Sequence, residues 1–135
     1  MRKYDLHIEK KRVPENFGSI VELAKHLKID KRTQEISLAV CWSNEDVFYS
    51  ILGIGNARAL TENTIQVAQF ALLCNADRVA VLHNHPTEAA EASEGDINHL
   101  NKLKKMLDIL DIELISDVIL SYDGSYTDII GGCND

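Results

Sequence analysis

A short, strongly apolar run extends from Arg78 to Leu82, and Pro86 follows shortly after it. Such a run is typical of a strand buried on both faces at the centre of a sheet. Two earlier segments, Glu35 to Trp42 and Val47 to Ile54, alternate in apolar character on either side of a turn-like Ser43–Asp46, which predicts a β-hairpin. The three strands together predict a sheet centred on the apolar run.

Three further segments carry apolar residues at the spacing of one helix face. They run over residues 19–27, 61–74 and 93–110. Thr61 or Asn63 is the expected N-cap of the second helix, because short polar side chains bind the free N–H groups of a first turn. Ser93 is the expected start of the third helix, with Asp96 in the first turn, where the helix dipole favours negative charge.

A final hairpin is expected from residues 112–122 and 126–130 around Asp123-Gly124, a favourable turn dipeptide. The order α-β-β-α-β-α-β-β predicts an α/β fold of the α+β mixed-sheet type, with helices flanking the sheet. A chain of 135 residues is the size of one domain. We expect that domain over residues 17–135, after a polar and basic extension of residues 1–16.

Composition narrows the function classes. The net charge of −7 disfavours non-specific nucleic-acid binding, which depends on neutralising phosphates, and the basic clusters Lys10–Arg12 and Lys102–Lys105 are interpreted as solvated faces. No apolar run approaches the roughly 20 residues of a membrane span. The first residues lack the apolar stretch of a secretory signal, so we expect a cytoplasmic protein without membrane contact.

The cysteines Cys41, Cys74 and Cys133 are widely spaced and form no C-x-x-C pair. Neither a disulfide framework nor a thiolate zinc site is therefore expected. Cys41 and Cys74 lie among apolar residues and are expected to be buried small hydrophobes.

Two histidines at the end of the central strand form the candidate metal site. His83 and His85 stand at positions i and i+2, so both imidazoles point to the same side of the strand. Asp96 follows across a loop. Two histidines and one carboxylate make three zinc ligands and leave a fourth position for water, which is the catalytic arrangement. The spacing alone leaves open that the histidines are ordinary surface or core residues and that Asp96 belongs to a helix cap.

The complete string adds a resemblance. His83-Asn84-His85-Pro86, followed by Ser93-Glu94-Gly95-Asp96, matches H-x-H-x7-S-x2-D and resembles the zinc motif of the JAB/MPN/JAMM metalloprotease superfamily. H-N-H-P resembles the RadC-like branch in particular. Three other segments match at the family's relative positions, so the resemblance covers roughly residues 17–130. These segments are Gln34-Glu35, Gly53–Asn56 and Asp117–Leu120.

The resemblance implies a cytidine-deaminase-like three-layer arrangement and one Zn²⁺ per chain on His83, His85 and Asp96. It places the general base on Glu35 and an oxyanion-stabilising hydroxyl on Ser93. The implied reaction is zinc-dependent hydrolysis of a peptide or isopeptide bond in a protein or peptide substrate. Relatives often work as a homodimer or with a partner protein, which we expect here as well.

The chain departs from the RadC-like pattern in two places. Residues 87–92 replace the usual Ser-Gly and prolines after H-N-H-P, which predicts a looser and more acidic loop. Val118 stands where the family has histidine, which predicts the loss of a group that supports the metal ligands. His99 is a candidate substitute for that group, or a plain surface residue.

Two other functions stay open. One is a non-catalytic domain that retains the metal site. The other is a DNA-repair-associated role, weakened by the acidic balance and by the lack, in these 135 residues, of the helix-hairpin-helix region of full-length RadC proteins.

Overall fold

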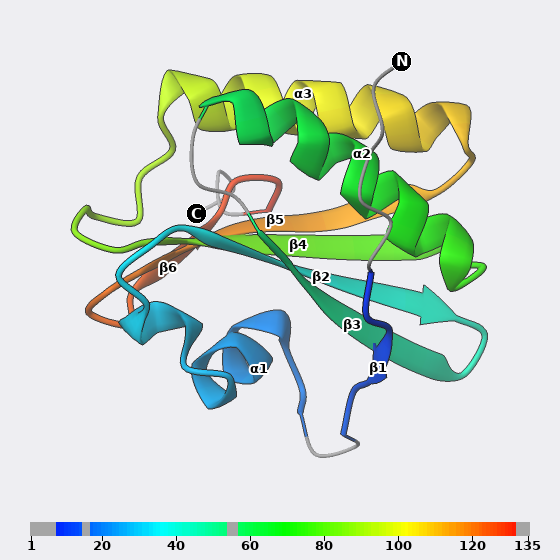
Figure 1. Cartoon of the computed structure of the whole chain (residues 1–135), viewed down its shortest axis with the longest axis horizontal. Coiled ribbons are helices and arrows are strands. Elements are labelled where there is room, and N and C mark those ends of the chain that lie inside the picture. Colours follow the sequence, from blue (N-terminus) through cyan, green and yellow to red (C-terminus); the bar gives the residue numbers. More distant parts are fainter. Residues whose placement is uncertain (1–7, 15–16, 54–56, 132–135) are drawn as a thin grey trace.

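The computed structural model describes residues 8–14, 17–53 and 57–131, and of residues 57–62 the backbone alone. A six-stranded sheet in the order β1-β3-β2-β4-β5-β6 forms the middle layer. Helix α1 covers one face, and helices α2 and α3 lie side by side on the other (Figure 1). The predicted α/β fold with a mixed sheet is confirmed.

The strands are β1 (Lys11–Arg12), β2 (Ile36–Ser43), β3 (Asp46–Gly53), β4 (Arg78–His85), β5 (Glu113–Ser121) and β6 (Tyr126–Asp128). The helices are α1 (Ile20–His26), α2 (Ala57–Leu73) and α3 (Glu94–Ile109), with a 3-10 turn η1 at Ile29–Lys31.

Strand β4 is central, as its apolar run predicts. It pairs antiparallel with β2 on one side and parallel with β5 on the other. A parallel pair needs a crossover connection, and α3 provides it between β4 and β5. This connection places the start of α3 next to the end of β4, where the candidate ligands lie.

Alternation along the strands divides the core into two clusters. Ala39 and Cys41 of β2 pack with Val81 against α2 and α3. Leu38 and Val40 face the opposite side and pack with α1. The two faces of β2 are those that the sequence predicts, and both Cys41 and Cys74 are buried, as expected. Cys133 lies outside the described residues.

Several element boundaries differ from the sequence prediction. Thr61 and Asn63 are wrong as N-caps, because α2 already begins at Ala57 and both residues lie within the helix. Strand β4 extends through both histidines to His85. Lys11 and Arg12, in the predicted extension, pair with Tyr49 and Phe48 of β3. The predicted Asp123-Gly124 turn is confirmed, with Gly124 at a φ of 88°, which glycine adopts readily.

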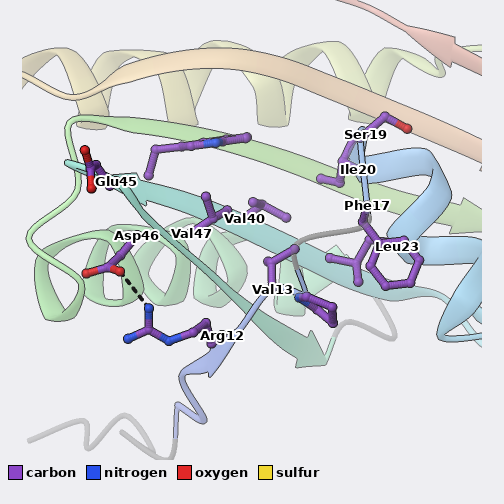
Figure 2. Close-up of a pocket in the computed structure, with 13 residues that line it drawn as sticks. Arg12, Val13, Phe17, Ser19, Ile20, Leu23, Val40, Glu45, Asp46 and Val47 are labelled. Atoms are coloured by element: carbon purple, nitrogen blue, oxygen red, sulfur yellow. Dashed lines mark hydrogen bonds and ion pairs between the residues drawn. The ribbon is translucent and has the colours of Figure 1, made fainter.

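A hollow lies on the α1 face of the sheet, away from the histidines. It has a volume of about 440 Å³ and an apolar floor that includes Val40, Val47 and Leu23 (Figure 2). At its rim, Arg12 and Asp46 form an ion pair at 2.6 Å. Among the described residues it contains no cluster of metal-ligating groups, so the candidate site lies elsewhere, at the histidines. Within the described chain, no helix has the length and apolar character that crossing a membrane requires.

Candidate metal centre

The candidate ligands come from two elements, β4 and α3, that meet where β4 ends. His83 and His85 end β4 on its α2/α3 face, which is also the face of Val79 and Val81. Asp96 lies in the first turn of α3. The Ser93 side chain caps this helix, and Asp96 completes a capping box with the Ser93 backbone N–H. Local sequence therefore fixes each half of the site, and the β4–α3 crossover joins them.

The three side chains converge. One ligand atom from each of His83, His85 and Asp96 lies within 4.8 Å of the others. His83 Nε2 is 3.1 Å from Asp96 Oδ1, and His85 Nε2 is 3.3 Å from Asp96 Oδ2. The rings of the two histidines are 5.2 Å apart between centroids. The expectation that these residues share one site is confirmed.

A hydrogen bond on the far side of His85 fixes its tautomer. Its Nδ1–H donates to the carbonyl oxygen of Ala89 at 2.9 Å. The Nε2 atom of the neutral ring therefore keeps its lone pair and faces Asp96 and His83. A backbone carbonyl behind a histidine is the usual support for a metal ligand.

The donor set fits a zinc-type ion. Two imidazole nitrogens and one carboxylate are a common catalytic zinc set. His83 Nε2 is buried and makes no hydrogen bond within the described residues, although it lies against Asp96. Such an orphaned nitrogen is explained by a cation that shares the carboxylate. The cluster can therefore hold a metal ion.

Protons compete with a metal here. Burial lowers the pKa of His83, but the carboxylates of Asp96, Asp117 and Glu35 outweigh it and raise the pKa above its ordinary value. Burial also opposes ionisation of Asp96, yet contact with His83 and hydrogen bonds from Ser93 hold its pKa well below the usual range. Because a histidine must be deprotonated to bind metal, affinity is expected to fall as the pH falls.

A small polar cavity adjoins the ligands. Its volume is about 20 Å³, roughly the space of one water molecule. Glu35, which precedes β2, is half-buried and lines this cavity. The other polar residues that line it are Ser37, Asn63, His83, Asp96, His99 and Asp117. The glutamate named by the resemblance thus reaches the same cavity as His83 and Asp96.

Two residues on the cavity wall have unpartnered donors or acceptors. Asn63 is buried, and its Nδ2 has no hydrogen-bond partner within the described part of the chain. His99 Nε2 is likewise buried and unpaired, and burial lowers the pKa of His99 to about 4. Asn63 Nδ2 and His99 Nε2 therefore present polar atoms at the cavity wall. No pattern in the sequence pointed to a role for Asn63 beyond helix capping.

The expectation that Val118 replaces a group supporting the metal ligands is wrong. It is buried against α1, on the face of the sheet opposite the ligands. Its pairing with Leu82 explains this, because parallel neighbours point to the same side. A valine there removes no support from the metal ligands. Its neighbour Asp117 is the residue that faces the cavity, and burial raises its pKa to about 7.

The loop of residues 87–92 is anchored, contrary to the looser loop that its sequence predicts. The Glu88 carbonyl accepts a hydrogen bond from Ser121 Oγ at 2.8 Å, and the Ala89 carbonyl holds His85. Ala90 is buried. Backbone carbonyls make these bonds, so the family's prolines are not needed for them.

Comparison with known proteins bears on this site. A family model described as "RadC-like JAB domain" matches residues 16–129. No curated protein matches the chain. The matched range contains Glu35, Ser93 and all three candidate ligands.

Proposed function

The chain belongs to the RadC-like JAB domain family, and we propose that it is a zinc-dependent hydrolase that cleaves a peptide or isopeptide bond. One observation carries the proposal. The ligand atoms of His83, His85 and Asp96 lie within 4.8 Å of one another, and Glu35 lines the cavity beside them. A metal site with an adjacent free carboxylate is the minimum that metal-assisted hydrolysis requires.

His83, His85 and Asp96 would hold the ion. When bound, zinc supplies a Lewis acid that polarises a carbonyl and lowers the pKa of water from 15.7 to about 7. Glu35 acts as the general base, taking a proton from the attacking water and passing it to the leaving amine. Its position in a cavity of one-water size supports this role.

Ser93 has a structural role and a proposed chemical one. Its Oγ accepts a hydrogen bond from the Asp96 N–H at 3.1 Å, which leaves the hydroxyl proton available to donate. Ser93 is exposed at the start of α3, so its hydroxyl can reach a bound substrate. We assign it to offsetting the negative charge that develops on the carbonyl oxygen.

The substrate class follows from the reaction. A protein or peptide, including an isopeptide-linked conjugate, presents the carbonyl and leaving amine that Glu35 and the ion serve. A cytoplasmic location and a homodimer or partner protein belong to the same proposal. The acidic charge of −7 does not support DNA as substrate.

A non-catalytic domain that retains its metal is the second candidate. The observation in its favour is the small cavity, about 20 Å³, which leaves little room for a substrate group without local movement. Turnover separates the two candidates, since both predict metal binding.

The experiment compares wild-type protein, loaded with one equivalent of zinc, with a His83→Ala variant on a peptide library and a ubiquitin-like conjugate. We expect cleavage by the wild type, its loss with a chelator, and its restoration by zinc. Zinc binding without cleavage would favour the second candidate. Failure to bind zinc would contradict both.

A further inference from the structure

Asn84 stands between the two histidine ligands but faces the other side of the sheet. It is fully buried, with none of its surface exposed. Alternation along β4 turns His83 and His85 toward α2 and α3, and Asn84 away from them. The side chain is therefore not a metal ligand, and its burial requires another explanation.

The Asn84 amide binds the backbone on both sides of Glu35. The Ile36 N–H donates to Asn84 Oδ1 at 2.6 Å, and Asn84 Nδ2 donates to the Gln34 carbonyl at 3.0 Å. Glu35 is the residue between these two bonded groups. Both hydrogen bonds are part-buried and join segments 48 and 50 residues apart in the sequence.

These bonds replace a rung of the sheet. Pairing between β2 and β4 begins at Ser37 opposite His83. The pairing ends there, and at the next position the Ile36 N–H bonds to the Asn84 side chain. A primary amide offers one acceptor and two donors, like a peptide group. Among side chains of this size, aspartate lacks the donor and leucine lacks both groups, so asparagine alone makes both bonds.

We propose that Asn84 is a positioning residue, whose amide holds the backbone around Glu35 so that the Glu35 carboxylate stays beside His83 and Asp96. The inference rests on the proposed role of Glu35 as general base. Asn84 would then act on the opposite face of the sheet from the two ligands beside it. The tripeptide His83–His85 would place both the metal ion and the general base.

The first measurement needs no turnover. In Asn84→Ala the Ile36 N–H loses its hydrogen bond to the Asn84 side chain. We therefore expect amide exchange at Ile36 to accelerate by about tenfold or more. Asn84→Asp keeps the acceptor for Ile36 and should retain most of the protection, which also guards against a failure of the alanine variant to fold. The matched control is Asn101→Ala, at an exposed position on α3. Unchanged Ile36 exchange in Asn84→Ala would overturn the proposal.

The second measurement follows Glu35 itself. In wild type, the ¹³Cδ signal of Glu35 should shift when zinc binds; in Asn84→Ala it should respond less, at unchanged zinc stoichiometry. Equal responses would overturn the proposal even if the chain proves inactive, so the outcome is separable from that of the proposed function.

If the chain hydrolyses a library peptide, Asn84→Ala should lower kcat by about 100-fold, the effect of misplacing a catalytic group by roughly 1 Å, with KM unchanged. In a Glu35→Gln background the same substitution should have no further effect. An equal loss in both backgrounds would show that Asn84 does not act through Glu35.

Discussion

Ser93 and Asp96 hold each other in place. The Ser93 backbone N–H donates to Asp96 Oδ2 at 2.9 Å, and the Asp96 N–H donates to Ser93 Oγ at 3.1 Å. One of the two bonds that begin α3, from the Ser93 N–H, is thus also the bond that orients the carboxylate of a candidate metal ligand. The Ser93–Asp96 capping box therefore both begins the helix and positions the candidate ligand.

Replacing Ser93 by alanine should therefore have two effects. The loss of the cap should cost about 1 kcal/mol of unfolding free energy. Fraying of the first turn of α3, which carries Asp96, should weaken zinc binding about 10-fold or more. Ser19→Ala is the matched control, because Ser19 caps α1 by accepting from the Glu22 N–H at 3.1 Å. Thermal unfolding and zinc titration would compare the variants. Equal zinc affinities would contradict a link between cap and ligand.

Removing the imidazole of His85 should abolish metal binding. His85→Ala leaves one histidine and one carboxylate, too few to hold zinc tightly. Metal analysis after dialysis should give about one zinc per chain for the wild type and close to none for the variant. His26→Ala, at an exposed position in α1, should keep its zinc. Full zinc content in His85→Ala would remove this residue from the ligand set.

Glu35→Gln should separate binding from hydrolysis. The amide keeps the size of the side chain but cannot accept the proton, so we expect zinc content to stay near one per chain while hydrolysis falls by at least about 100-fold. Glu113→Gln changes an exposed glutamate at the start of β5 and should leave hydrolysis unchanged. Full activity in Glu35→Gln would reject Glu35 as the base.

Asp117 should make the zinc-free protein less stable at neutral pH than in mild acid. Burial raises its pKa from 3.8 to about 7. Between these two values the folded state keeps a proton that the unfolded chain releases, so this contribution is complete below about pH 4 and is lost as the pH rises toward 7.

Asp117→Asn removes the titration. The stability of this variant relative to wild type should therefore increase from about pH 4 to about pH 7, by an amount on the order of 2–4 kcal/mol. Urea unfolding of zinc-free protein at several pH values would measure it. A difference that does not change with pH would show that Asp117 is not buried as a neutral acid.

Much of the site was predictable because its parts are local. The period of two along β4 is enough to put His83 and His85 on one face, and three residues suffice to make the Ser93–Asp96 capping box. The family string then adds Glu35, which no spacing argument would select among 21 acidic residues.

Most of the elements, the two faces of each strand and the local geometry of each half of the site can be predicted from the sequence, since backbone periodicity and capping depend on near neighbours. Which residues meet across the fold depends on the tertiary structure. It turned Val118 toward α1, brought Asp117 and Asn63 to the cavity wall, and joined Asn84 to the backbone around Glu35. Periodicity predicts which side of a strand a residue faces, whereas strand register and helix packing determine which residues it contacts there.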